Sequence, residues 1–284
     1  MRTLHRDMKR GVSSGEPLPD PWPVFAKNRM TFRRGSLSMI AGPPGSMKTV
    51  MALNLVRQMG SSVPTLYHSS DSDNFTMASR SLSMLTGQSS DESEFAVMAQ
   101  QQAAYESLRE MEHVRWSFKA SPSMEFLRAE AEAFREIKGE YPHHTIIDIL
   151  MNVDYEGISE YNYQNLMLEL NTMAREQETA ITLIHHTSES AKGGSPPPRS
   201  AVMGKANQLP TLILTLWGDS AAGKLMVATV KNRFGPQDAM AKKFITMKAD
   251  PAVCLIEEAA PGEFDEDSIF KGGAWLDDDE KVDE

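Results

Sequence analysis

The spacing of apolar residues along the chain predicts strands and helices in alternation as far as residue 186. Short apolar or β-branched runs predict strands at residues 36–42, 63–70, 95–99, 114–118, 141–148 and 178–186. Apolar residues at helical spacing predict helices at residues 48–59, 74–85, 101–112, 124–138 and 163–174. Alternation of this kind is typical of a mostly parallel sheet with helices on both faces.

The pattern changes after residue 187. A long connector rich in Gly, Ser and Pro occupies residues 187–207, and strands without intervening helices are predicted at 211–217, 225–231 and 242–248. We therefore predict an α/β fold in which a mostly parallel sheet, flanked by helices, ends in a C-terminal antiparallel hairpin.

Composition and charge divide the chain into three parts. Its 284 residues are 40% hydrophobic and 24% charged, which is enough for one sizeable core. Residues 257–284 contain 12 acidic residues and two lysines, so the formal net charge of −10 belongs to this segment. We predict an N-terminal arm (1–35), one domain (36–256) and a disordered acidic tail (257–284). The tail is either a solubility device or an arm that binds a partner, such as a replication protein.

The sequence also excludes several classes of protein. No run approaches 18 consecutive apolar residues, and the first residues lack an apolar signal-peptide core, so we expect a cytoplasmic protein with no membrane partner. The single cysteine, Cys254, excludes an internal disulfide and is interpreted as a small, buried apolar residue.

Residues 41–49 (AGPPGSMKT) follow a predicted strand and open a predicted helix, as a phosphate-binding loop does. The pattern G-x-x-x-x-G-K-[ST] is matched except at Met47, which replaces the second glycine. Lys48 would neutralise the outer phosphates of ATP, and the Thr49 hydroxyl would ligate Mg²⁺. An L-residue close to the helix start can adopt the required backbone angles, so we predict that the loop still binds nucleotide. The predicted binding residues are Gly42, Pro43, Pro44, Gly45, Ser46, Met47, Lys48 and Thr49.

Carboxylates follow two other predicted strands. Asp148 ends the run HTIID and is predicted to hold Mg²⁺, whereas Asp154 follows after the apolar run has ended. Asp71, just after the second strand, is placed to activate water, with Asp73 as the alternate. A competing interpretation of this Asp-Ser cluster is the N-cap of the helix that begins at Asn74.

These motifs, in this order, resemble the RecA-like ATPase core of DnaB-type hexameric replicative helicases, including core-only members of plasmids and phages. The resemblance covers about residues 30–250. YHSSDSDNFTMASR is similar to the family's segment with a catalytic glutamate and an arginine, here Asp71 and Arg80. TIIDIL is similar to the second nucleotide motif, which contains Asp148. LIHHTSES is similar to the strand that senses the γ-phosphate, which makes His186 the predicted sensor.

The resemblance also implies an assembly. VKNRFGPQD is similar to the hairpin that inserts two cations, here Lys231 and Arg233, into a neighbour's ATP site, which implies a homo-oligomer, as a hexameric ring. The connector at 187–207 corresponds in position to the central-channel loop that grips single-stranded DNA. Its cations are Lys192, Arg199 and Lys205.

We therefore expect an ATP- and Mg²⁺-dependent DNA helicase or translocase of replication or recombination that acts on single-stranded or forked DNA. A RecA-like recombinase or single-strand annealing protein shares the fold and the phosphate loop, and so remains open. A regulatory ATPase or helicase loader is the third interpretation, in which Met47 marks slow hydrolysis.

Overall fold

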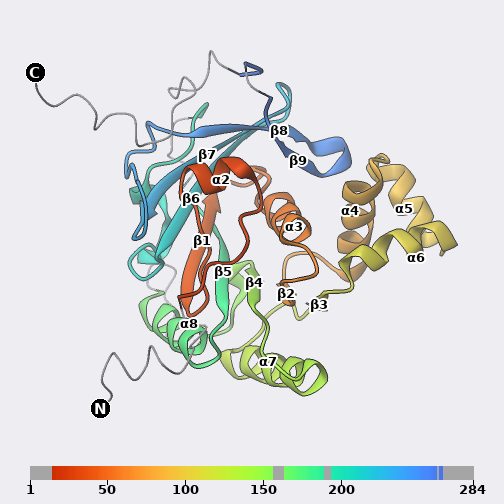
Figure 1. The fold of residues 1–284 in the computed structure, drawn as a ribbon, viewed down its shortest axis with the longest axis horizontal. Helices are drawn as coiled ribbons and strands as arrows, with labels where there is room; N and C mark the ends of the chain where they lie inside the picture. Colours follow the sequence, from red (N-terminus) through yellow and green to blue (C-terminus); the bar gives the residue numbers. More distant parts are fainter. Residues whose placement is uncertain (1–14, 156–162, 189–192, 261, 265–284) are drawn as a thin grey trace, which may run out of the picture.

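The computed structural model describes residues 15–155, 163–188, 193–260 and 262–264, and it is built around one large sheet. The strands are β1 (Ser36–Gly42), β2 (Thr65–Ser69), β3 (Val114–Ser117), β4 (His144–Asp148), β5 (Ala180–His186), β6 (Leu212–Asp219), β7 (Lys224–Asn232), β8 (Ile245–Asp250) and β9 (Leu255–Glu258). Their order across the sheet is β3-β2-β4-β5-β1-β6-β7-β8-β9 (Figure 1). The first six strands in this order are parallel, and β7, β8 and β9 are antiparallel. The predicted fold class is confirmed.

Helices cover both faces of the sheet. The α-helices are α2 (Pro23–Lys27), α3 (Lys48–Met59), α4 (Asn74–Thr86), α5 (Ser90–Met98), α6 (Gln102–Leu108), α7 (Met124–Lys138) and α8 (Gln164–Glu176). The 3₁₀ turns are η1 (Arg109–Met111), η2 (Leu150–Asn152), η3 (Arg199–Ala201), η4 (Met203–Lys205) and η5 (Pro251–Val253). One core cluster joins α3 and α4 to one face, and a second joins α7 and α8 to the other.

The described part of the predicted N-terminal arm packs against the first of these core clusters. Its buried side chains are those of Leu18, Trp22, Phe25, Met30 and Phe32. These five residues expose at most 5% of their surface, so burial of their apolar area stabilises the domain of their own chain.

Helices α5 and α6 correct one prediction made from the sequence. The predicted strand at 95–99 is wrong, because these residues lie mostly in α5. Ser89 caps that helix by accepting from the Glu92 amide, and Glu92 in return accepts from the Ser89 amide, which fixes a helix start. The predicted helix at 101–112 corresponds to α6 followed by η1.

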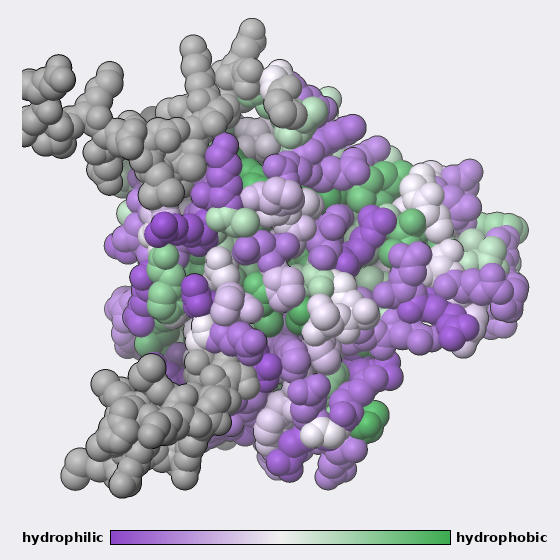
Figure 2. All heavy atoms as spheres, viewed as in Figure 1, coloured by the Kyte–Doolittle hydropathy of each residue, from purple (hydrophilic) through white to green (hydrophobic). Residues whose placement is uncertain are grey.

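Helices α4, α5 and α6 form a lobe that projects from the sheet beside β2 and β3 (Figure 1). Phe95, Met98 and Tyr105 each expose more than 60% of their surface on this lobe. Figure 2 shows hydrophobic residues at the end of the lobe and a mostly hydrophilic surface elsewhere on this face. None of the described helices is long and apolar enough to cross a membrane.

Candidate functional site

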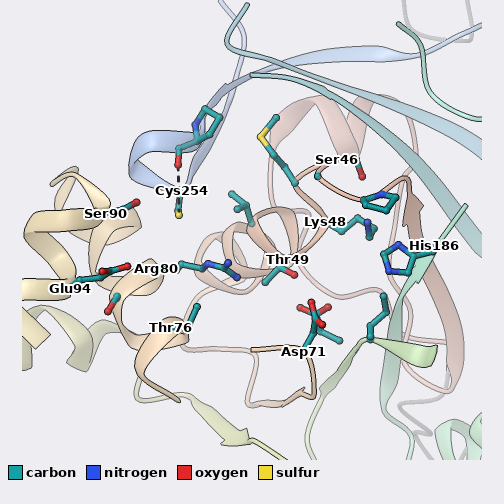
Figure 3. A pocket seen from close by; sticks show the side chains of 18 residues that line it. Ser46, Lys48, Thr49, Asp71, Thr76, Arg80, Ser90, Glu94, His186 and Cys254 are labelled. Carbon is teal, nitrogen blue, oxygen red and sulfur yellow. Dashed lines mark hydrogen bonds between the residues drawn. The ribbon is translucent and has the colours of Figure 1, made fainter. Parts of the chain in front are cut away.

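The carboxyl ends of four parallel strands meet at one edge of the sheet and bring the predicted nucleotide residues together. In the register of the sheet, Gly42 at the end of β1 is opposite His186 on β5, and Ser69 on β2 is opposite Asp148 on β4. Ligands of open parallel sheets bind outside such strand ends. A pocket of about 560 Å³ lies here, and Lys48, Thr49, Asp71, Asp148 and His186 are among the residues that line it (Figure 3).

Lys48 lies at the first residue of α3, with its ammonium turned back over the phosphate loop. Its Nζ donates to the carbonyl oxygens of Gly42 (3.1 Å) and Pro43 (2.8 Å). Burial lowers the pKa of Lys48 to about 8, although the charges of Asp148 and Asp71 act in the opposite direction. A phosphate would supply the counter-charge that the buried ammonium lacks, so the loop fits the outer phosphates of a nucleotide.

Met47 caps α3 in a left-handed backbone conformation, with φ of 63° and ψ of 27°. Glycine adopts this conformation without a steric penalty, whereas for an L-residue it costs roughly 1–2 kcal/mol, which explains why glycine is usual at this position of the motif. The methionine side chain lies over Gly218 of β6, where an added Cβ would come within 2.6 Å of its terminal methyl carbon. The loop thus keeps the required geometry with an L-residue in the place of glycine.

Replacing Met47 by valine is expected to weaken nucleotide binding about tenfold, because a β-branched residue is strained in the left-handed region. Met47→Asn is the matched control, since asparagine tolerates that region, and its affinity should stay within about threefold of the unmodified protein. Titration with a fluorescent ATP analogue measures both. Equal affinities for the two variants would show that the loop does not need this conformation to bind.

Asp148 is buried at the floor of the pocket, where two hydroxyl groups contact it. The Tyr67 hydroxyl donates to its Oδ2 (2.8 Å), and the Thr49 side chain also hydrogen-bonds to it. Burial raises the pKa of Asp148, and the charge of Asp71 raises it further, while these two hydrogen bonds and Lys48 lower it.

The oxygen atoms of Thr49, Asp71 and Asp148 suit Mg²⁺ by their chemistry. Mg²⁺ prefers oxygen ligands and usually keeps several waters, so it is held by one or two carboxylates together with substrate phosphates. The described residues contain no group of three or more His, Cys, Asp and Glu side chains that fits a metal ion. The site therefore fits a cation that arrives with the nucleotide, held through Thr49 and Asp148.

The two aspartates after β2 have different surroundings. The Asp73 side chain accepts from the Thr76 amide (2.7 Å) and is the N-cap of α4, so the competing interpretation of this cluster applies to Asp73. Asp71 lies in the pocket, close enough to influence the pKa values of Lys48, Asp148 and His186. Of the two, Asp71 alone lines the cavity in which a water would attack.

His186 joins the end of β5 to the phosphate loop. Burial, followed by the positive charge of Lys48, lowers the pKa of His186, and a hydrogen bond to the Gly42 backbone partly offsets this. The amide of Thr187 also donates to the Gly42 carbonyl (3.2 Å). A neutral imidazole therefore contacts the same carbonyl group as the Lys48 ammonium, so a change at the outer phosphates can reach β5 directly.

Lys231 and Arg233 lie at the opposite edge of the sheet. Lys231 is paired with Ile213 near the start of β6, whereas the phosphate loop follows the far end of β1, which runs parallel to β6. Neither cation lines the pocket of its own chain. Of the predicted DNA contacts, Arg199 and Lys205 lie in the η3 and η4 turns, and Lys192 lies outside the described residues.

Sequence reasoning missed several residues of the pocket. Tyr67 is buried on a strand and shows no polar signal in the sequence, yet its hydroxyl holds Asp148. Ser90 and Glu94 come from the segment assigned to a strand or left unassigned, and Cys254 comes from the turn before the unpredicted strand β9. Cys254 is buried as predicted, with 5% of its surface exposed, and it also lines the cavity.

The affinity for nucleotide is expected to fall as pH rises from about 7 to about 9.5, because Lys48 loses its proton near pH 8 in the empty pocket. Phosphates favour the charged form and raise this pKa, so binding near pH 8 should take up protons. Calorimetry of ADP binding in two buffers of different ionisation enthalpy measures that uptake, which Lys48→Met should abolish. An affinity that does not change over this pH range would contradict the assignment.

A phosphate loop after the first strand, a buried carboxylate two strands away and a mostly parallel sheet together define a P-loop ATPase domain of the RecA-like type. A family profile described as AAA domain matches residues 26–192, and the chain belongs to this family. It is 34% identical over 246 residues to the Gene 65 protein of Mycobacterium phage L5, covering 83% of this chain and 91% of that protein. The Gene 65 protein of Mycobacterium phage D29 is 32% identical over 220 residues, covering 74% and 94%.

Two solved structures share the fold. One is an ATPase domain solved on its own, which superposes with a TM-score of 0.75 at 14% identity, covering 90% of this chain and 96% of that one. The other is a DnaB-like replicative helicase, solved in a study of its interactions with primase, which superposes with a TM-score of 0.74 at 14% identity. This chain spans 65% of the length of that helicase chain. The fold is therefore that of the ATPase domain of DnaB-like helicases, as predicted.

Proposed function

We propose that the protein is an ATP-driven DNA helicase or translocase of replication or recombination that works as a RecA-like ring, with a hexamer as the expected form. The observation that carries the proposal is the position of the basic end of β7. Arg233 is exposed at the edge of the sheet opposite the phosphate loop, so it can complete an ATP site only in a neighbouring subunit.

Within one chain, the pocket supplies most of what phosphoryl transfer needs. Lys48 and the α3 amino terminus bind the outer phosphates, while Thr49 and Asp148 hold Mg²⁺, which neutralises charge on the phosphates. Asp71 orients the attacking water and accepts its proton. Arg233 from the next subunit then stabilises the charge of the transferring group, which makes hydrolysis depend on assembly.

DNA would be gripped by the loop between β5 and β6. The Thr187 to Val202 bridge and the bond from the Ser188 amide to the Ala201 carbonyl (2.9 Å) join this loop to the end of β5, next to His186. A change at the γ-phosphate that moves His186 would therefore move the loop. Several loops around a ring would follow a phosphate backbone without reading bases, so DNA affinity should fall steeply with salt.

The test is ATP-dependent release of one strand from a forked DNA duplex, with Lys48→Ala as the control. Release that requires both ATP and Lys48 supports a motor. Single-strand binding without release would favour a recombinase or annealing protein, which has the same fold. Negligible ATP turnover even with DNA would favour a regulatory ATPase or loader. Deleting residues 260–284 and comparing the replication proteins captured tests the acidic tail separately, and an unchanged set would exclude a partner-binding arm.

A further inference from the structure

The Lys231 ammonium is bound within its own chain. Its Nζ donates to the carbonyl oxygens of Asn207 (3.0 Å) and Gln208 (2.6 Å), which lie at the end of the loop between β5 and β6. Burial lowers the pKa of Lys231 to about 8, and the charges of Arg233 and Arg199 lower it further. The half-buried lysine is thus held by two backbone acceptors.

The segment that ends at these carbonyls, residues 199–208, is here called the grip segment. It contains the two described cations that are expected to bind DNA, Arg199 and Lys205. Asn207 extends the contact inward, because its Nδ2 donates to the carbonyl of Arg199 (3.1 Å). A single chain of hydrogen bonds therefore runs from the Lys231 ammonium through Asn207 to the backbone of a predicted DNA contact.

The other end of the grip segment is fixed to different elements. His185 Nε2 donates to the Met203 carbonyl (3.1 Å), and the Tyr163 amide donates to the Gly204 carbonyl (3.1 Å). Val202 and Ala206 are buried in the core beneath it. Because Lys231 is the contact at the 207–208 end, its loss would free that end while leaving the end next to β5 in place.

Arg233, two residues further along, differs from Lys231. Its side chain is exposed and forms no hydrogen bond or ion pair with any residue in the described ranges, while its amide donates to the Thr211 carbonyl (2.9 Å). Charge repulsion favours separation of these cations, since Arg233 and Arg199 both face Lys231 without a carboxylate within ion-pair distance in the part of the chain described. A guanidinium in this position can reach a phosphate of another subunit without first giving up a contact.

We propose that Lys231 is a positioning residue that fixes the grip segment of its own chain, and that Arg233 alone is the cation that β7 supplies to a neighbouring ATP site. This divides the two cations that the sequence assigned to one role. The part concerning DNA and the neighbour rests on the proposed function, whereas the contact of Lys231 with the grip segment does not.

Amide hydrogen exchange of the full chain tests the positioning role directly. Lys231→Met should raise exchange in a peptide covering 199–209 about tenfold, because two charge-assisted hydrogen bonds are lost. Lys231→Arg, which keeps donors in reach of both carbonyls, should restore protection. Lys248→Met removes an exposed lysine of β8 and should change nothing there, and Arg233→Ala should also leave the peptide protected. Unchanged exchange in Lys231→Met, or an equal rise in Arg233→Ala, would overturn the proposal.

Binding of oligo-dT, measured by anisotropy without nucleotide, gives the second readout. Lys231→Met should weaken binding about tenfold and Lys231→Arg should restore it, whereas Arg233→Ala should lower ATP turnover with little change in oligo-dT affinity. Full oligo-dT affinity in Lys231→Met would overturn the proposal even if the exchange result were as expected. If the unmodified protein fails to bind oligo-dT, the proposed function fails, while the exchange measurement still decides whether Lys231 positions the segment.

Discussion

Replacing Asp71 by asparagine is expected to lower ATP turnover by about 10²–10⁴-fold, because the amide cannot accept the proton of the attacking water. Asp71 faces the pocket near Lys48 and Asp148, so its substitution leaves the phosphate loop and the Mg²⁺ ligands in place. Nucleotide affinity should therefore remain, or rise slightly as a negative charge is removed near the phosphates. Steady-state turnover and titration with an ATP analogue separate these two effects.

Asp73→Asn is the matched control, since the same atoms change two residues further along the chain. Asp73 caps α4 through the Thr76 amide, and asparagine caps helices as well as aspartate does. Turnover in this variant should stay within about threefold of the unmodified protein, because neither folding nor the pocket is disturbed. A loss as large as that of Asp71→Asn would show that the base assignment is wrong.

Asp71→Glu addresses the length of the side chain. The resemblance to DnaB-type helicases implies glutamate at this position, and aspartate is one methylene shorter. A variant that keeps or exceeds the unmodified turnover would show that the pocket has room for the longer carboxylate. Turnover as low as in Asp71→Asn would instead show that the distance from β2 to the attacked phosphate is set for aspartate.

The strand ends that form the site were predictable from the sequence because each combines a local motif with a buried strand. The phosphate loop and Asp148 each follow an apolar run, and parallel strands bring their carboxyl ends to one edge. Asp71 and Asp73 were left unresolved, since both follow the same strand. Only the three-dimensional position of the Thr76 amide identifies Asp73 as the cap.

Other parts of the site could not be predicted because they depend on contacts distant in sequence. Tyr67 meets Asp148 across 81 residues, and Lys231 meets Asn207 across 24. The segment 95–99 was assigned to a strand on its short apolar run, whereas the capping box at Ser89 and Glu92 decided for a helix. A stronger weight on that local signal would have corrected the assignment.

Replacing Arg233 by alanine is expected to lower ATP turnover by about 10³–10⁵-fold, the effect typical of an arginine that stabilises transition-state charge. The site would lose this charge although the pocket of the same chain is unchanged, because Arg233 lies at the opposite edge of the sheet. Nucleotide binding by each chain should be retained. Loss of binding together with turnover would indicate a folding defect, which a thermal melt would reveal.

Mixing Arg233→Ala with Asp71→Asn, two nearly inactive variants, should restore activity once subunits exchange. An interface that combines the pocket of an Arg233→Ala chain with the arginine of an Asp71→Asn chain is intact, and about a quarter of interfaces in an equal mixture are of this kind. Mixing Asp71→Asn with Lys48→Ala supplies the control, because both changes damage the pocket side and no interface is complete. Recovery in the first mixture alone would require that the arginine act in trans. Two mixtures that are equally inactive would instead place the catalytic cation within one chain, which the position of Arg233 in the sheet opposes.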